Sequence, residues 1–495
     1  MLDPLSLIDQ ARRHFEAAAR DAALGDFGRA SAHYRDAALT VGPAWRHTDA
    51  PADTRTVAAR LAADAIYAGA MAAVRAELAA DVLLREATLL GLELYEAEDL
   101  SAGVRVHGLY RAQCAAFELG HLVTESDPID AVALFRDAAG CVAAVGALDL
   151  DDEADEVFAA RILANGAAAH VALASLLRSM NDSSFKDHFT EAITCGKDAI
   201  ESGALPAGLE VETMLVLADA AFELGLSTED RRHAVTAFED ALGWTRLASE
   251  APGADGGLQA QALLKGANVA CVYGLTVRHD DLQQGLDALA GAIALAMTAA
   301  EADHLPLDLR AQALDTAVRT QQNVALLLRE RSPSEACDAF ARAATMARDA
   351  ATLPALPPPV QANLLYLAAN ATLETAILRQ QLAGTERHAA ALEGLASVQD
   401  LARAVLALPH AQPDIVVRAA LLGCGAAGRL LRALDPLQDE QSIQTELETI
   451  VMFGERAART EGADPELRSR AAYFAADAAE KLAERRPHPP TPSPV

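Results

Sequence analysis

Large and small apolar residues recur in a fixed pattern along the whole chain. In the segment 127–139, Ala131, Phe135 and Ala138 fall at positions i, i+4 and i+7, which share one face of a helix. A small residue usually follows the bulky one three positions later, so we expect close packing of neighbouring helices around it. The bulky position returns about every 51 residues. It is filled by Tyr34, Leu84, Phe135, Phe189, Phe238, Leu289, Phe340, Leu392 and Leu447.

Prolines and short polar turns divide this pattern into helical hairpins. In the third hairpin, Ser126 or Asp127 is a candidate cap for a helix that starts at Pro128. In the second hairpin we expect helices at 53–73 and 76–97, although no turn residue separates them. The first helix is expected at 4–23 and the last at 465–485. Later hairpins are expected at 206–249, 257–301, 306–351, 358–408 and 413–460, most of them opened by a proline.

These elements predict an all-α fold, an open right-handed α-solenoid of about nine antiparallel hairpins with a C-terminal capping helix. We expect residues 1–462 to form the solenoid, 463–486 the capping helix and 487–495 a disordered, proline-rich tail. A period near 51 leaves about 20 residues for each helix, or roughly 30 Å.

Composition and charge narrow the range of partners. Hydrophobic residues make up 52% of the chain but aromatic residues only 4%, as expected for closely packed helices rich in Ala and Leu. The net charge of −29 disfavours binding to nucleic acid or to anionic lipid.

The six cysteines are isolated, without a CxxC pair, which indicates buried thiols in a reducing compartment. We find no signal peptide and no run approaching the roughly 18 uncharged apolar residues of a membrane span, and therefore expect a cytoplasmic protein.

Motifs typical of enzymes and cofactor sites have simpler explanations here. The GxGxxG of residues 423–428 falls where a helix is expected, so its glycines would let two helices touch. The acidic segment 151–155 fits a DDxxD metal motif, but acids before a helix N-terminus also favour the helix dipole. His170 and His388 are expected to be packed or solvated. The sequence contains no HExxH, GxxxxGK[ST] or GxSxG, so we expect no catalytic residue, no metal and no cofactor.

The first hairpin resembles part of a tetratricopeptide (TPR) repeat, through Gly25, Asp26, Phe27, Ala30, Tyr34, Ala37 and Pro43. The long hairpins with proline-led openings resemble the TPR-like arrays found beside caspase-like CHAT peptidases in bacteria. Asn268-Val269-Ala270 and Asn323-Val324-Ala325 carry the motif at the centre of this resemblance, which spans about 100–480. The resemblance implies a protein-binding array, and any such peptidase would be another chain.

In TPR arrays the first helix of each hairpin lines the concave groove. In this chain those helices share a position, mostly polar, filled by Glu16, Asp64, Gln113, Asn165, Asp219, Asn268, Asn323, Asn370 and Gly425. An Asn there can bond the backbone of an extended peptide, or it can tie one hairpin to the next. As candidates for the peptide-binding groove we take Asn165, Asp219, Asn268, Asn323 and Asn370.

We therefore predict a non-catalytic scaffold that binds a protein or an extended basic peptide and regulates an effector such as a caspase-like peptidase. Two alternatives remain open. One is an α/α-toroid enzyme, in which the hairpins close into a ring around a cavity. The other is a sensor array for a separately encoded signalling ATPase. The sequence leaves the oligomeric state undetermined.

Overall fold

The chain folds into paired helices. The computed structural model describes residues 3–150, 152–302, 305–354, 356–382, 384–434 and 439–485, and these residues form helices and connecting turns without strands. The elements are α1 (Pro4–Ala23), α2 (Phe27–Trp45), α3 (Ala52–Arg75), α4 (Asp81–Glu96), α5 (Ala102–Val123), α6 (Pro128–Val145), α7 (Glu153–Ser179), α8 (Phe185–Glu201), α9 (Ala207–Ser227), α10 (Arg231–Glu250), α11 (Gly256–Val277), α12 (Leu282–Glu301), α13 (Leu307–Leu328), α14 (Pro333–Ala351), α15 (Pro358–Gln381), α16 (Thr385–Ala407), α17 (Pro413–Ala433), α18 (Glu440–Ala458) and α19 (Pro465–Arg485).

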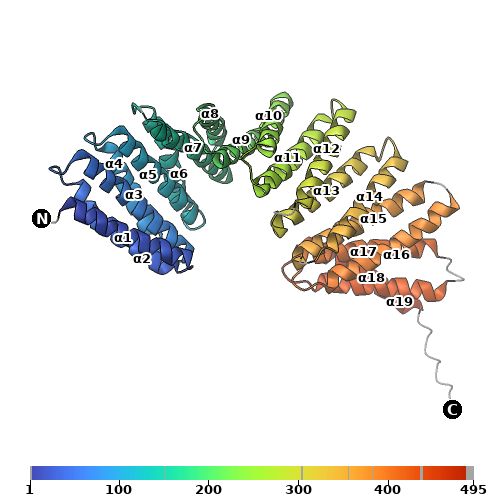
Figure 1. Cartoon of the computed structure of the whole chain (residues 1–495). Coiled ribbons are helices and arrows are strands. Elements are labelled where there is room, and N and C mark those ends of the chain that lie inside the picture. The colour runs from blue at the N-terminus through green and yellow to red at the C-terminus, as the bar shows by residue number, and fades with distance from the viewer. Residues whose placement is uncertain are drawn as a thin grey trace, which may run out of the picture. The chain divides into compact units, whose positions relative to one another are not determined.

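The backbone contacts divide the chain into two compact units, Met1–Leu258 and Gln259–Val495. Within each unit the helices form antiparallel hairpins stacked side by side, as Figure 1 shows. The all-α stack of hairpins is therefore confirmed. Its right-handed twist, its openness and the domain boundaries at 462 and 486 stay predictions, and the expected tail 487–495 lies outside the described residues.

The predicted helix limits hold closely where the chain carries a clear cap or proline. α1 and α19 occupy 4–23 and 465–485 as expected. Asp127, rather than Ser126, caps α6, because its carboxylate accepts a hydrogen bond from the Asp130 backbone N–H at 3.0 Å. Pro128 then occupies the first position of the helix, where its missing N–H costs nothing.

The turn between α3 and α4 differs from the prediction. The sequence pattern starts the second helix at residue 76, but α4 starts at Asp81. The Leu78 N–H bonds to the Ala73 carbonyl at 2.9 Å and Glu77 adopts a left-handed φ of 54°, which is the geometry of a Schellman ending. Glycine usually fills this left-handed position, so a glutamate there gave no sequence signal.

The repeating bulky residues form the core of the hairpins. Phe135, Phe189, Phe238 and Phe340 are all at most 2% exposed. Two hairpins are exceptions. Tyr34 in the α1–α2 hairpin is only partly buried. In the α15–α16 hairpin Leu392 is only partly buried and Leu395 is fully buried instead. The repeat pattern therefore placed the bulky position of α16 about one helical turn too early. Because α16 is rich in Ala and Leu, several of its positions fit the pattern equally well.

Glycines in one helix of a hairpin make room for the bulky residue of its partner. A Cβ atom added at Gly423 would lie 2.6 Å from the Phe453 ring, and one at Gly120 would lie 2.7 Å from the Phe135 ring. Gly423 belongs to the GxGxxG segment, which lies inside α17, as expected of a helix-contact motif. A Cβ atom added at Gly425 or Gly428 would meet nothing within 4 Å, so these two glycines do not serve a close helix contact.

Consecutive hairpins pack mainly through the second helix of one against the first helix of the next, and their odd-numbered first helices also contact one another. Among the described residues, α1 contacts α3, α3 contacts α5, α5 contacts α7 and α7 contacts α9 in the first unit. In the second unit α13 contacts α15, α15 contacts α17 and α17 contacts α19. Even-numbered helices of neighbouring hairpins make no comparable contacts among the described residues, so the odd-numbered helices form the more closely spaced row. We call these odd-numbered helices the inner helices.

Candidate binding groove

An open groove runs across the inner helices of the second unit. Its volume is about 550 Å³, and it receives side chains from α11, α13 and α15 and from the start of α17. We call it the inner groove. Most of its lining residues are polar, although apolar atoms make up the larger part of the exposed lining. The residues are Asn268, Asp308, Ala311, Gln312, Asp315, Thr316, Arg319, Pro359, Val360, Asn363, Gln412 and Ile415.

Hydrogen bonds across the groove connect neighbouring inner helices. Asn363 of α15 donates its amide to Asp315 Oδ1 of α13 at 2.6 Å. Arg319 donates to the other oxygen of Asp315, also at 2.6 Å. Thr316 donates its hydroxyl to Asn268 Oδ1 of α11 at 3.0 Å. The polar groups of three successive inner helices are thereby held in a defined arrangement around the open volume.

The charge of the groove is mainly negative. Arg319 forms an ion pair with Asp315 on its own helix. Asp308, in the first turn of α13, adds a second carboxylate to the groove, and this one is exposed. Amide oxygens of Asn268 and Asn363 and the side chain of Gln312 add acceptors without positive charge. Such a surface favours ligands that donate hydrogen bonds and carry positive charge.

The structure brings only one of the five predicted groove residues into this volume. Asn268 lines it, whereas Asn323 donates its amide to the thiol of Cys271 on α11, with 3.7 Å between Nδ2 and Sγ. Asn165, in the first unit, does the same toward Cys114 on α5 at 3.3 Å. Asn370 is half-buried on α15, and Asp219 is half-buried on α9. The side-chain amide of Asn165 thus links α7 to α5, and that of Asn323 links α13 to α11, in each case joining an inner helix to the preceding one.

Asp315, Thr316, Arg319 and Asn363 were missed by the sequence analysis, although a signal was present. Asp308, Gln312, Asp315 and Arg319 recur at spacings of four, three and four residues, which places them on one face of α13. A comparison of one polar position in each helix does not reveal this continuous polar stripe along a single helix.

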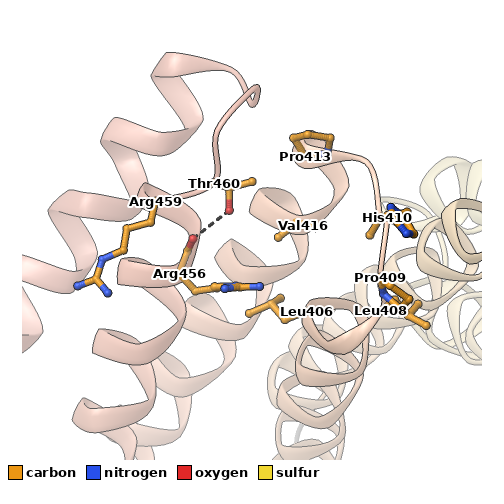
Figure 2. A pocket seen from close by; sticks show the side chains of 10 residues that line it. Leu406, Leu408, Pro409, His410, Pro413, Val416, Arg456, Arg459 and Thr460 are labelled. Carbon is orange, nitrogen blue, oxygen red and sulfur yellow. Dashed lines mark hydrogen bonds between the residues drawn. The ribbon is translucent and has the colours of Figure 1, made fainter.

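A second cavity, of about 370 Å³, lies at the junction of α16, α17 and α18 (Figure 2). Leu406, Pro413 and Val416 form its apolar wall. Figure 2 shows the Arg456 side chain extending toward Leu406, while Arg459 points away on the other side of α18. The cavity sits where loops meet and involves only one inner helix, so it is a weaker candidate for binding an extended ligand.

The first unit has an aromatic hollow of about 380 Å³ between α1, α2, α3 and α5. Asp64 lies at its edge and accepts hydrogen bonds from Arg111 at 2.7 Å, with His107 Nε2 3.0 Å away. Burial raises the pKa of the Asp64 carboxyl, but the contacts with His107 and Arg111 outweigh burial and hold the pKa below its usual value. Asp64 is ion-paired with Arg111 and in contact with His107, which suits a structural role between α3 and α5.

The acidic segment 151–155 also has a structural explanation in the described residues. Asp152 caps α7 by accepting the Ala154 N–H at 3.0 Å, and Asp155 is buried 3.4 Å from Arg60. Asp151 lies outside the described residues.

His170, which the sequence analysis expected to be packed or solvated, packs against His188, with 3.2 Å between the two Nδ1 atoms.

Two helices are long and apolar enough to cross a membrane by length and composition alone, α3 and α7. The charges Arg60 and Asp64 interrupt α3, and Arg161 interrupts α7, so neither is the uncharged run sought in the sequence. About half of each apolar stretch is buried within the chain, where both act as inner helices.

Comparisons with known proteins define no family. No protein-family model matches the chain, and no curated protein matches it. Among solved structures, the nuclear import adaptor Nro1 of S. pombe matches with a TM-score of 0.39 and 12% identity, covering 69% of this chain and 99% of Nro1. A second Nro1 structure, described as a hypoxic regulator of sterol synthesis and nuclear import adaptor, gives 0.37 and 13% identity over 73% of this chain and 99% of that one. A circular tandem repeat protein gives 0.26 and 16% identity over 97% of both chains.

Proposed function

We propose that this chain is a non-catalytic scaffold that binds an extended, basic segment of another protein in the inner groove. The observation that carries the proposal is the convergence of side chains from four successive inner helices, α11, α13, α15 and α17, on one open volume. A single helix pair would offer a short contact, whereas four stacked helices offer a track along which a chain can lie.

The chemistry of the groove fits an extended peptide. A peptide backbone presents alternating N–H donors and carbonyl acceptors, and the amide of Gln312 together with the amide nitrogen of Asn268 can meet both. Asp308 adds an exposed negative charge for Lys or Arg side chains, whereas the charge of Asp315 is shared with Arg319, and the overall charge of −29 attracts a cationic partner. Affinity for such a partner falls as the salt concentration rises.

The finer parts of the proposal follow from the sequence. The partner is a protein, not nucleic acid or a membrane, and the scaffold acts in the cytoplasm. The resemblance to CHAT-associated arrays makes a separately encoded caspase-like peptidase a reasonable effector to be regulated. The helices supply binding and positioning, and the chemistry belongs to the partner.

A direct test uses two fluorescent peptides of equal length, one alternating Arg and Ser and one alternating Glu and Ser. Fluorescence anisotropy should show saturable binding of the Arg peptide by the full chain, weakened by added salt, and little binding of the Glu peptide. The double variant Asp308→Asn/Asp315→Asn should weaken binding of the Arg peptide by roughly tenfold or more, as expected for two lost charge contacts.

The matched control removes two carboxylates from an even-numbered helix. Asp338→Asn/Asp349→Asn changes the net charge by the same amount on α14, where both residues are exposed. If this control lowers affinity as much as the groove variant, binding reflects overall charge and the proposed groove is wrong. Equal binding of the Arg and Glu peptides would refute the basic ligand.

A further inference from the structure

The first hairpin, which belongs to the other unit from the inner groove, contains a group of side chains of metal-ligating types. His14 of α1 and His33 and Asp36 of α2 each place one ligand atom within 4.8 Å of the others. The His14 and His33 ring centroids are 6.2 Å apart. In the part of the chain that the structure describes, this is where three His, Cys or acidic side chains come close enough to share an ion.

The surroundings of His33 are those of a metal ligand. Its Nε2 atom lies 3.6 Å from Asp21 Oδ2, close enough for the carboxylate to favour a proton on that nitrogen. Its Nδ1 atom is shielded from solvent and has no hydrogen-bond partner among the described residues. A neutral imidazole protonated on Nε2 carries a lone pair on Nδ1, and this lone pair is left without a donor. A carboxylate behind one nitrogen and an unused lone pair on the other is the usual arrangement of a metal-binding histidine.

We propose that His14, His33 and Asp36 bind a divalent transition metal of the Zn²⁺ type. Two imidazole nitrogens and one carboxylate oxygen match the donor set that zinc accepts, with a fourth position left for water. Ligand atoms around a tetrahedral zinc ion are about 3.4 Å apart, given bond lengths of about 2.1 Å. The ligand atoms lie within 4.8 Å of one another, so binding would require the side chains to rotate closer together, and the exposure of Asp36 and the partial exposure of His14 and His33 leave room for this.

The position of the site gives the metal a structural role. The ion would cross-link α1 and α2, the first helices of the described chain, whose hairpin packs onto the following one through α2 and α3 and through α1 and α3. Among the described residues this hairpin contacts the rest of the first unit through α3, and a hairpin with few neighbouring helices unfolds locally more easily. A metal bridge between its two helices would stabilise this hairpin.

The sequence pattern could not reveal this site, since its histidines lie on different helices and form no short motif. His33 and Asp36 alone are an ordinary i, i+3 pair. Only the packing of α1 against α2 brings His14 beside them.

Calorimetric titration of the metal-stripped full chain with ZnCl₂ tests the proposal. We expect saturable binding with a strong site of one ion per chain, and His14→Ala or His33→Ala should weaken that site at least tenfold. Asp21→Asn should weaken it by roughly tenfold, as found when a carboxylate behind a ligating histidine is removed. His233→Ala is the matched control, because His233 lies 3.1 Å from Asp230 in a similar His–Asp pair without a second histidine.

Two further measurements separate this site from others and from folding defects. Co²⁺ should give a visible d–d absorption band that is lost in His33→Ala and retained in His188→Ala, which removes the rival His170–His188 pair. Zn²⁺ should raise the thermal unfolding midpoint of the native chain but not that of His14→Gln, whose circular dichroism verifies folding. The absence of saturable Zn²⁺ binding by the native chain would overturn the proposal. The proposal would also be overturned if His188→Ala abolished Zn²⁺ binding, or if Zn²⁺ bound with unchanged affinity to both His14→Ala and His33→Ala.

Discussion

The close approach of the α4 and α5 backbones gives a direct test of how packing limits stability. Gly91 of α4 faces Gly108 of α5, and a Cβ atom at Gly91 would press on the Gly108 carbonyl and lie 2.8 Å from the Ala112 backbone nitrogen. Backbone atoms cannot rotate away as side chains do, so Gly91→Ala must push the two helices apart. Overpacking of this kind costs about 1–3 kcal/mol, and we expect the upper end of that range here.

The gain in helix propensity acts in the opposite direction. Replacing a mid-helix glycine by alanine stabilises a helix by about 1 kcal/mol. The net change expected for Gly91→Ala is therefore a loss of about 2 kcal/mol in the free energy of unfolding. Gly140 of α6 is the matched control, since it is exposed and an added Cβ there meets nothing within 4 Å. Gly140→Ala should stabilise the chain by about 1 kcal/mol.

Urea unfolding followed by far-UV circular dichroism measures both changes, and hydrogen exchange of the α4 and α5 amides localises them. Local exchange matters because a repeat array can unfold in parts rather than as one unit. Gly91→Ala should speed exchange in α4 and α5, while Gly140→Ala should not. The reasoning is refuted if both variants shift stability in the same direction, or if Gly91→Ala is as stable as the native chain.

Four further outcomes are expected. Burial and the neighbouring His188 lower the pKa of His170 from 6.5 to about 4, so below pH 6.5 the unfolded chain takes up a proton that the native chain does not, and stability falls as the pH drops toward 4. His170→Gln should reduce that loss in urea midpoints measured across this range, whereas the exposed control His233→Gln should leave it unchanged; equal losses in native and His170→Gln chains would contradict the assignment. Gln113 is fully buried and donates to the Ala138 and Ile162 carbonyls at 3.0 and 2.9 Å, so Gln113→Leu should cost about 1–2 kcal/mol in urea unfolding, and an unchanged midpoint would argue against this link between α5, α6 and α7. Burial raises the pKa of Cys424 to about 12, so a disulfide reagent at neutral pH should label the half-exposed Cys271 long before Cys424, as mass spectrometry of the labelled peptides would show; the reverse order would contradict the packing of α17. Small-angle scattering should give the elongated distance distribution of an open array, and a compact, ring-like distribution would instead favour the toroid alternative.

Much of the helical framework could be read from local features. Asp127 and Pro128 start α6 because a carboxylate cap and a fixed proline φ act within a single turn. Phe135, Phe189, Phe238 and Phe340 are buried as the repeat predicts, because spacing along a helix alone decides which residues share a face. Where local signals were weak, the predictions were wrong by a few residues. The start of α4 was placed before the turn at Glu77, and the buried position of α16 was placed at Leu392 instead of Leu395.

The candidate sites depended on contacts between residues far apart in the chain. Asn363 meets Asp315 only because α15 packs against α13, and the same packing opens the groove beside them. Asn165 and Asn323 stood at the same repeat position as Asn268, yet their amides reach thiols on the preceding inner helix. Which polar groups stay available for a ligand is thus decided by neighbours that the repeat pattern does not specify.

The amino-acid sequence by itself determined the helices, their pairing into hairpins and the buried face of each, because these follow from interactions within a few residues and from apolar burial. The tertiary structure alone decided that Asp315 and Asn363 face one groove and that His14 joins His33 and Asp36. Helix packing sets those distances, and a difference of a few ångströms separates a hydrogen-bonded tie from an open binding position.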